Sequence, residues 1–243
     1  MTTISTSPPS SASPSSSGGH PASEEVARRL AAVRTRIAEA GGDPDRVRVV
    51  AVTKGFGAEA VRAALGAGMR DLGENYAAEL EAKAEVLGAE PGVGGPPLWH
   101  FLGAIQRNKV AHLAPVVGLW QSVARESEGA RIARFAPGAA VLVQVDTTGL
   151  PGRNGCAPDE VPTLVNRLRA LGLDVRGLMT VAAPGSDAAR AAFRSVGRLA
   201  DELELVERSM GMTDDLEEAV AAGSTMVRIG RALFGPRPSG VAA

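Results

Sequence analysis

Short apolar runs alternate along the chain with longer stretches of helical periodicity. The runs are typical of buried strands, and the stretches between them place apolar residues every three or four positions, as on one face of a helix. We expect strands at residues 46–54, 69–75, 97–103, 119–124, 139–146, 173–182, 203–211 and 225–230. The segment 203–211 carries two acidic residues and an arginine, so partial helix is an alternative there.

Each expected strand is followed by a helix or a short helical turn. This order implies parallel pairing through right-handed crossover connections. Eight such units in about 215 residues suit an α/β fold of the small (β/α)8 barrel type. An open, doubly wound sheet is the alternative.

The two ends of the chain differ from its body. Residues 1–22 are rich in Ser, Thr, Pro and Gly and carry no charged side chain, so we expect a disordered tail. An extra helix is expected directly afterwards, with one apolar face formed by Val26, Leu30, Val33 and Ile37. We assign the barrel to residues 23–237 and a short C-terminal tail to 238–243.

Composition excludes several classes of protein. The 243 residues include 26 basic and 27 acidic side chains, and aromatic residues make up 3%. A nucleic-acid binder is not expected, because there is neither excess positive charge nor a stacking platform. No apolar run approaches the ~20 residues that cross a membrane. The single cysteine, Cys156, and the absence of a secretory signal pattern predict a cytoplasmic protein.

Polar residues gather where the expected strands end. Functional groups of a barrel lie at the carboxyl ends of its strands, so these residues would share one rim. They include Lys54, Asn75, Gln106, Asn108, Gln144, Asp146, Thr180, Ser209 and Arg228. The pattern predicts a ligand site at that rim.

Lys54 ends the most apolar strand, VVAVTK. Desolvation there would lower its pKa and provide a neutral amine that attacks carbonyl groups. The alternative is a lysine whose side chain extends into solvent.

Two glycine-bearing turns follow the seventh and eighth strands, in SMGMTDD (209–215) and RIGRALFG (228–235). Barrels form phosphate sites from these two loops, where backbone N–H groups point at the anion. Ser209 would add a hydroxyl, while Gly211 and Gly230 permit close approach. The alternative is that both glycines serve only tight turns.

Arg228 shares a strand face with Met226 and Gly230, because side chains alternate with period two. An inward arginine needs an anion or an acceptor to offset its burial. A ring nitrogen of a heterocycle would serve, and so would an ion pair with Glu74.

Other reactive residue types give weaker signals. His20, His100 and His112 are too isolated to suggest a metal site, and we expect His100 to be a core or near-site residue. We expect Cys156 to be unreactive.

The chain resembles the pyridoxal phosphate homeostasis proteins. The matching segments are AVTK (51–54), LGENYAAEL (72–80), WHFLGAIQRNK (99–109), RGLMTVA (176–182), SMGMTDDLEEAV (209–220) and GSTMVRIGRALFG (223–235). The resemblance implies a barrel like the N-terminal domain of alanine racemase, and we expect a monomer.

The resemblance also implies roles for single residues. Lys54 would form the internal aldimine with pyridoxal 5′-phosphate (PLP), and Arg228 would face the pyridine nitrogen. Asn75 would lie near the ring hydroxyl and Met179 beside the ring. The phosphate would be held by Ser209, Gly211, Gly230 and the backbone at Arg231, and Met210 would also belong to the cofactor site.

Three departures from the family pattern are visible. Thr53 stands where serine often precedes the lysine, and Arg231 where Thr or Ser usually follows VRIG. Arg153-Asn154-Gly155 replaces the common Lys-x-Gly. A backbone N–H contact to phosphate would survive the change at residue 231. The third departure puts in doubt any role that depends on the lysine of the family's Lys-x-Gly pattern.

The residues favour a carrier of the cofactor over an enzyme. An arginine opposite the pyridine nitrogen weakens the ring as an electron sink. Racemisation also needs a second base on the opposite face of the ligand, usually a tyrosine from another domain or subunit, and this chain has one tyrosine, Tyr76, just after the second strand. We expect a protein that buffers PLP and delivers it to PLP-dependent apoenzymes. A weak amino-acid racemase and a barrel enzyme acting on a phosphosugar are the alternatives.

Overall fold

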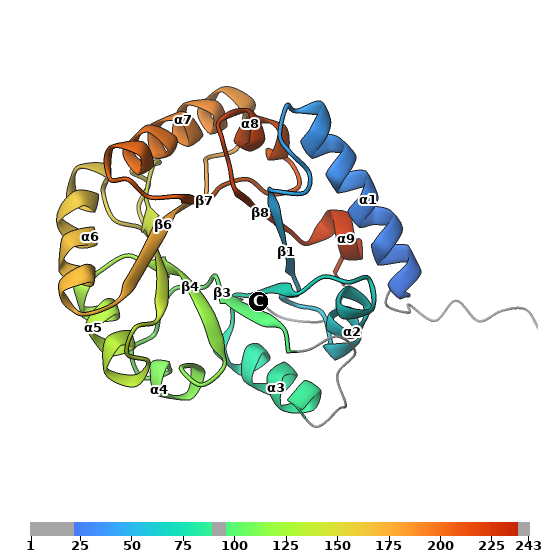
Figure 1. The fold of residues 1–243 in the computed structure, drawn as a ribbon, viewed down its shortest axis with the longest axis horizontal. Helices are drawn as coiled ribbons and strands as arrows, with labels where there is room; N and C mark the ends of the chain where they lie inside the picture. Colours follow the sequence, from blue (N-terminus) through green and yellow to red (C-terminus); the bar gives the residue numbers. More distant parts are fainter. Residues whose placement is uncertain (1–21, 89–95, 238–243) are drawn as a thin grey trace, which may run out of the picture.

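The computed structural model describes residues 22–88 and 96–237. The tails expected at residues 1–22 and 238–243 therefore lie outside the described part, apart from residue 22. The eight expected strands are all present, as β1 Arg48–Val52, β2 Asp71–Glu74, β3 Leu98–Phe101, β4 Val117–Val123, β5 Ala140–Val145, β6 Asp174–Thr180, β7 Glu207–Ser209 and β8 Met226–Ile229. All pairings are parallel, and β1 pairs with both β2 and β8, which closes the barrel (Figure 1). The barrel prediction is confirmed, and the open-sheet alternative is wrong.

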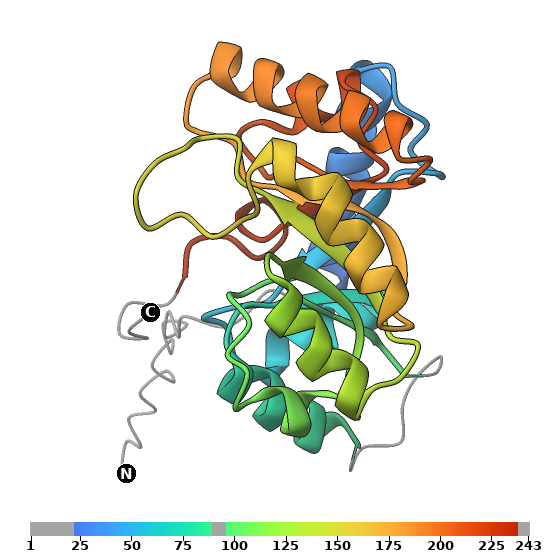
Figure 2. The same ribbon diagram turned by 90° about the vertical axis from the view of Figure 1, so that its left-hand side faces the viewer.

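The helices surround the barrel as Figure 1 shows. They are α1 Ser23–Glu39, α2 Ala58–Gly66, α3 Ala77–Gly88, α4 Val110–Leu113, α5 Glu126–Phe135, the 3-10 helix η1 Pro158–Glu160, α6 Val161–Ala170, α7 Ser186–Glu202, α8 Leu216–Ala221 and α9 Arg231–Phe234. The connection between β5 and η1, residues 146–157, projects as a wide loop beyond the barrel (Figure 2). None of the described helices is long and apolar enough to cross a membrane.

The expected N-terminal helix is α1, which packs against α2, α8 and α9. Its buried residues are the four predicted ones, Val26, Leu30, Val33 and Ile37. Two arginines of α1 reach the region after β7 and β8: Arg36 donates to the backbone oxygen of Thr213 (2.9 Å), and Arg29 donates to that of Leu233 (3.1 Å). Helix α1 thus braces both glycine-bearing turns from outside the barrel.

The segment 203–211 is strand over only three residues. Helix α7 ends at Glu202, and Glu204 has a φ of 54°, in the left-handed region. This reversal leaves only Glu207–Ser209 to pair with the neighbouring strands.

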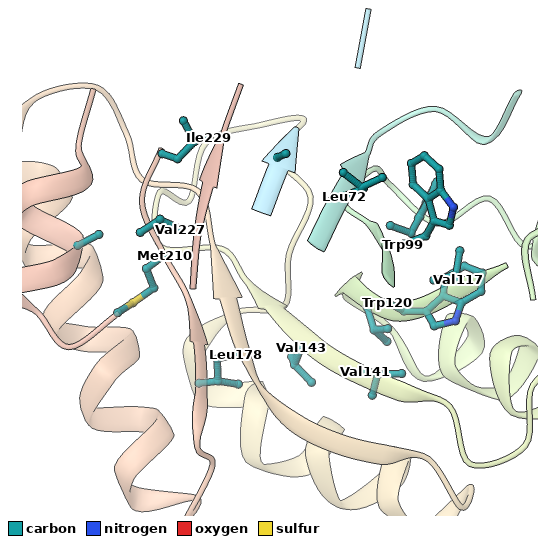
Figure 3. Packing of buried hydrophobic residues seen from close by; sticks show 14 of the residues in the cluster. Leu72, Trp99, Val117, Trp120, Val141, Val143, Leu178, Met210, Val227 and Ile229 are labelled. Atoms are coloured by element: carbon teal, nitrogen blue, oxygen red, sulfur yellow. The ribbon is translucent and has the colours of Figure 1, made fainter. Parts of the chain in front are cut away.

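Side chains of the strands divide into an outer and an inner set. The outer set packs between strands and helices and includes Leu72, Trp120, Val143, Leu178 and Val227 (Figure 3). The inner set is a separate, smaller apolar cluster of Val50, Leu119, Ala140, Leu142, Met179 and Met226. Because side chains alternate along a strand, this division places Arg228 with Met226 on the inner face, as predicted.

Candidate functional site

A cavity of about 720 Å³ opens where the carboxyl ends of the strands meet. Six of the predicted site residues line it: Lys54, Asn75, Met179, Arg228, Gly230 and Arg231. These six residues come from four strands or the connections that follow them: β1, β2, β6 and β8. Gln144 and Asn154 also line the cavity, and the Asn154 amide donates to Gln144 Oε1 at 2.9 Å.

Lys54 follows the inner residues Val50 and Val52 with period two, and Val52 lines the cavity. Burial lowers the pKa of the Lys54 amine from its ordinary value of 10.5, and the cations of Arg237 and Arg228 lower it further. The carboxylates of Glu74 and Glu79 oppose this decrease. No hydrogen bond or ion pair holds Lys54 Nζ among the residues described. The side chain is a partly buried amine that is free to react.

A buried polar network lies behind Lys54, on the outer side of the strands. Lys83 of α3 donates to Glu74 Oε1 (2.5 Å), Glu79 Oε2 (3.0 Å) and the backbone oxygen of Thr53 (2.8 Å). The Thr53 hydroxyl donates to Glu74 Oε1 at 2.6 Å. Glu79 Oε2 also accepts the backbone N–H of Gly55 at 2.9 Å.

This network holds the backbone on both sides of Lys54. The carbonyl of Thr53 and the N–H of Gly55 are each fixed by a side chain of α3. Burial raises the pKa of the Glu74 carboxyl, while the ammonium of Lys83 acts in the opposite direction. Sequence reasoning missed Lys83 and Glu79, although both stand one or two helical turns into the segment after the second strand.

Arg228 is 5% exposed and is held by oxygen acceptors. Its Nη1 donates to the backbone oxygen (2.7 Å) and the Oγ (2.8 Å) of Ser209, and its Nη2 donates to the backbone oxygen of Thr180 (2.7 Å). Burial lowers the pKa of the guanidinium to about 10, and Asp215 opposes this. The alternative prediction, an ion pair between Arg228 and Glu74, is wrong. Glu74 lies on the outer face of β2 together with Leu72, whereas Arg228 lies on the inner face of β8.

The two glycine-bearing turns lie side by side. Gly211 has a φ of 92°, and a Cβ there would meet the side chain of Ala219 in α8. The backbone N–H of Arg228 donates to the Gly211 oxygen at 3.0 Å, which joins the turns after β7 and β8. A Cβ at Gly230 would lie 3.2 Å from the backbone oxygen of Val52, so the second turn also sits close to β1.

Three predicted residues of the first turn do not line the cavity. The side chain of Ser209 is buried in the barrel, where its Oγ donates to Gln121 at 2.6 Å. Met210 is buried in the outer apolar cluster, and Gly211 is not among the lining residues. The turn instead presents Met212, Thr213 and Asp214 to the cavity.

Two further cations lie at the cavity. Arg231 lines it and forms an ion pair with Asp214. Arg237 lines it too, close to Gly55 and therefore to the backbone of Lys54. Sequence reasoning missed Arg237; the signal for it was an arginine soon after the last glycine-bearing turn.

The isolated histidine and the cysteine behave as expected. His100 is fully buried, with hydrogen bonds to Asp71 (2.9 Å) and Gln121 (2.6 Å). Burial raises the pKa of the Cys156 thiol to about 11, which leaves it protonated and unreactive at neutral pH. No group of three or more potential metal ligands occurs in residues 22–88 and 96–237.

Comparison with known proteins identifies the same family that the sequence motifs resemble. The family described as "Alanine racemase, N-terminal domain" matches residues 23–238. The chain is 39% identical over 230 residues to the pyridoxal phosphate homeostasis protein of Pseudomonas aeruginosa, covering 90% of this chain and 97% of the relative. It is 42% identical over 215 residues to that of Deinococcus radiodurans, covering 84% and 97%.

Solved structures agree. PipY of Synechococcus elongatus with PLP bound is 33% identical, with a TM-score of 0.75, and covers 86% of this chain and 100% of PipY. Lysine decarboxylase from Selenomonas ruminantium, at 19% identity and a TM-score of 0.66, shares the fold over 88% of this chain and 61% of the decarboxylase. On these matches the chain belongs to the family of pyridoxal phosphate homeostasis proteins, built on the fold of the alanine racemase N-terminal domain.

Proposed function

We propose that this protein binds PLP covalently through Lys54 and holds it for release in the cytoplasm, where PLP-dependent apoenzymes are the recipients. The observation that carries the proposal is the shared cavity. An amine with a lowered pKa, a buried guanidinium and the second glycine-bearing turn all face the same space. PLP would supply an aldehyde, a heteroaromatic ring and a phosphate dianion.

The residues present fit these three parts. The neutral amine of Lys54 would attack the aldehyde carbon, since only the unprotonated form is a nucleophile, and the aldehyde oxygen would leave as water. Arg228 would donate to the ring nitrogen and so keep that nitrogen unprotonated. Met179 would pack against the ring, and Asn75 would lie near the ring hydroxyl.

The phosphate would bind at the glycine-bearing turns. Backbone N–H groups at Gly230 and Arg231 would donate to its oxygens, and the side chain of Arg231 would add a positive charge. For the first turn, we propose that its backbone contributes at Gly211. We do not place Met210 against the phosphate, because its backbone N–H donates to the backbone oxygen of Met226 at 3.1 Å and its side chain is buried in the outer apolar cluster. The hydroxyl of Ser209 reaches the phosphate only if it gives up its bond to Gln121.

Binding without turnover is supported by what surrounds the cavity. An arginine at the ring nitrogen disfavours carbanion chemistry, because an unprotonated ring accepts electrons poorly. Racemisation needs a second base on the opposite face of the ligand. Tyr76, the one tyrosine of the chain, is 39% exposed and is not among the residues that line the cavity.

Reductive trapping tests the proposal directly. The chain has only three lysines, Lys54, Lys83 and Lys109. Purified protein should take up PLP with a long-wavelength absorbance band, and borohydride followed by peptide mass spectrometry should place the adduct on Lys54. Lys54→Ala should lose band and adduct, while Lys109→Ala, which changes an exposed lysine, should keep both. An adduct that persists in Lys54→Ala would refute the proposal, and D-amino acids formed by the wild type would restore the racemase alternative.

A further inference from the structure

A chain of hydrogen bonds runs through the barrel below Arg228. Arg228 Nη1 donates to Ser209 Oγ at 2.8 Å, and Ser209 Oγ donates to Gln121 Oε1 at 2.6 Å. Gln121 Nε2 lies 2.6 Å from His100 Nδ1, and His100 Nε2 lies 2.9 Å from Asp71 Oδ1. Asp71 is the first residue of β2, so the chain links the cavity to the opposite end of the barrel.

The two ends fix the direction of every bond. A guanidinium only donates and an ionised carboxylate only accepts. The Ser209 hydroxyl accepts a hydrogen bond from the guanidinium, and its own O–H donates to Gln121 Oε1. The amide nitrogen of Gln121 then donates to His100 Nδ1 and to Met226 Sδ, which lies 3.0 Å away. His100 is thus neutral, with its proton on Nε2 and directed at the carboxylate.

The far end of the chain is anchored by charge. Arg48 Nη1 lies 3.7 Å from Asp71 Oδ1, and Arg48 Nη2 lies 2.8 Å from Glu207 Oε2. These contacts tie β1, β2 and β7 together at the amino ends of the strands. They also keep a cation beside the carboxylate that ends the chain of hydrogen bonds.

The near end determines how Arg228 meets a ligand. Three of its five N–H donors bond Ser209 and Thr180, and the part of the chain that the structure describes leaves two for the cavity. With Nη1 bonded twice and Nη2 once, rotation of the guanidinium would break at least one of these bonds. The O–H of Ser209 is directed at Gln121 Oε1, so the lone pairs of Ser209 Oγ are available to Nη1.

We propose that Ser209, Gln121 and His100 are positioning residues for Arg228, and that they set the affinity and the absorbance of PLP at a distance. None of the three is among the residues that line the cavity. The inference rests on the proposed function, because it concerns the orientation of the group that would face the ring nitrogen. It adds that the orientation of the Arg228 guanidinium is determined by residues that lead toward the amino ends of the strands.

Substitution of Gln121 tests the inference. Gln121→Leu keeps the volume and removes both hydrogen-bonding groups, so the Kd for PLP should rise about tenfold and the long-wavelength band should shift. Gln121→Glu keeps an acceptor for Ser209 and should stay closer to the wild-type Kd and spectrum. Leu119→Met is the matched control on the same strand and inner face, and should leave both unchanged.

The stability of the variants is measured first, by thermal unfolding without PLP. If Gln121→Leu does not fold, Ser209→Ala decides in its place, because it removes the same link with a smaller change. Wild-type Kd and spectrum in a folded Gln121→Leu or Ser209→Ala would overturn the inference.

A measurement without PLP separates the inference from the proposed function. In ¹H–¹⁵N spectra of the imidazole rings of ligand-free protein, His100 should carry its proton on Nε2 in the wild type. A proton on Nδ1 in the wild type would overturn the hydrogen-bond chain, whereas a wild type that binds no PLP would overturn the proposed function and leave this result standing.

Discussion

Two lysines lie on opposite sides of the same strand ends, and they differ in how many oxygens their side-chain nitrogens contact. Lys83, on the outer side, is 5% exposed and donates to three oxygens within 3.0 Å. Lys54, on the inner side, lines a cavity and has no hydrogen-bond acceptor in the described ranges. Burial is therefore common to both, and the number of acceptors distinguishes them.

The difference separates a lysine that stabilises the fold from a lysine whose surroundings favour a neutral amine. The side-chain nitrogen of Lys83 donates to three oxygens, so its N–H groups are all engaged in holding the surrounding backbone and carboxylates. The pKa of Lys54 is lowered by burial and by two nearby arginines. The structural lysine, in turn, fixes the backbone from which the reactive lysine extends.

The largest expected effect comes from exchanging each lysine for methionine. Lys83→Met leaves the buried carboxylate of Glu74 unpaired and should reduce the free energy of unfolding by about 3–5 kcal/mol. Lys54→Met should change it by less than ~1 kcal/mol, because no bond is lost. Urea denaturation measures both. Equal stability of the two variants would contradict the comparison. The double variant Glu74→Gln/Lys83→Met should recover part of the free energy of unfolding that Lys83→Met loses.

Arg228→Gln tests the cation that faces the cavity. Loss of a charged hydrogen bond to the ring should weaken PLP binding by about 1.5–3 kcal/mol, roughly tenfold to a hundredfold in Kd, and alter the absorbance of the bound cofactor. The fold should survive, since the substitution also removes a buried charge. Titration with PLP, followed by absorbance and circular dichroism, checks both statements; an unaltered Kd and band would remove Arg228 from the site.

The pH dependence of trapping should distinguish Lys54 from an ordinary lysine. Its neutral fraction grows as pH rises through a pKa that lies below 10.5, so the rate of reaction with PLP should reach half its maximum below pH 10.5. Arg237→Gln removes a nearby cation and should move that midpoint upward. Stopped-flow absorbance from pH 7 to 10.5 measures the shift, and a midpoint that falls or stays would contradict the assigned cause.

The same lowered pKa affects stability. Between the lowered value and 10.5 the folded protein binds fewer protons at Lys54 than the unfolded chain does, so this residue makes the free energy of unfolding rise with pH. Below that window its unfavourable contribution is constant. The rise should be absent from Lys54→Met.

Glu79→Gln should give the smallest effect. An amide oxygen still accepts from Lys83 and from Gly55, so stability should fall by only about 1 kcal/mol. Because Glu79 raises the pKa of Lys54, its neutralisation should lower that pKa and speed trapping at neutral pH. Slower trapping than in the wild type would show that the backbone contact outweighs the charge.

The fold could be predicted because periodicity identifies strands and their inner faces. The alternation that puts Met226 inside also puts Arg228 inside, and strand order brings Lys54 to the rim with Gly230. The same rule applied to Leu72 would have placed Glu74 outside and excluded its pairing with Arg228.

What could not be predicted depends on the fit between elements. Lys83 reaches Thr53 only because of how α3 lies against β1 and β2, which no local pattern encodes. Likewise, the hydroxyl of Ser209 points at Gln121, a partner 88 residues away in the chain. Contacts of this kind are set by the helix register and the closure of the barrel.

The closure of β1 against β8 has a consequence for biosynthesis. Val50 is opposite Arg228 in this pairing, so the amine and the anion-binding turns come from opposite ends of the sequence. In a chain that is still being synthesised, residue 54 is present long before residue 228. Lys54 then has no glycine-bearing turns beside it. On the proposed function, PLP would therefore be retained only after the last strand has docked, and bound PLP would report that folding is complete.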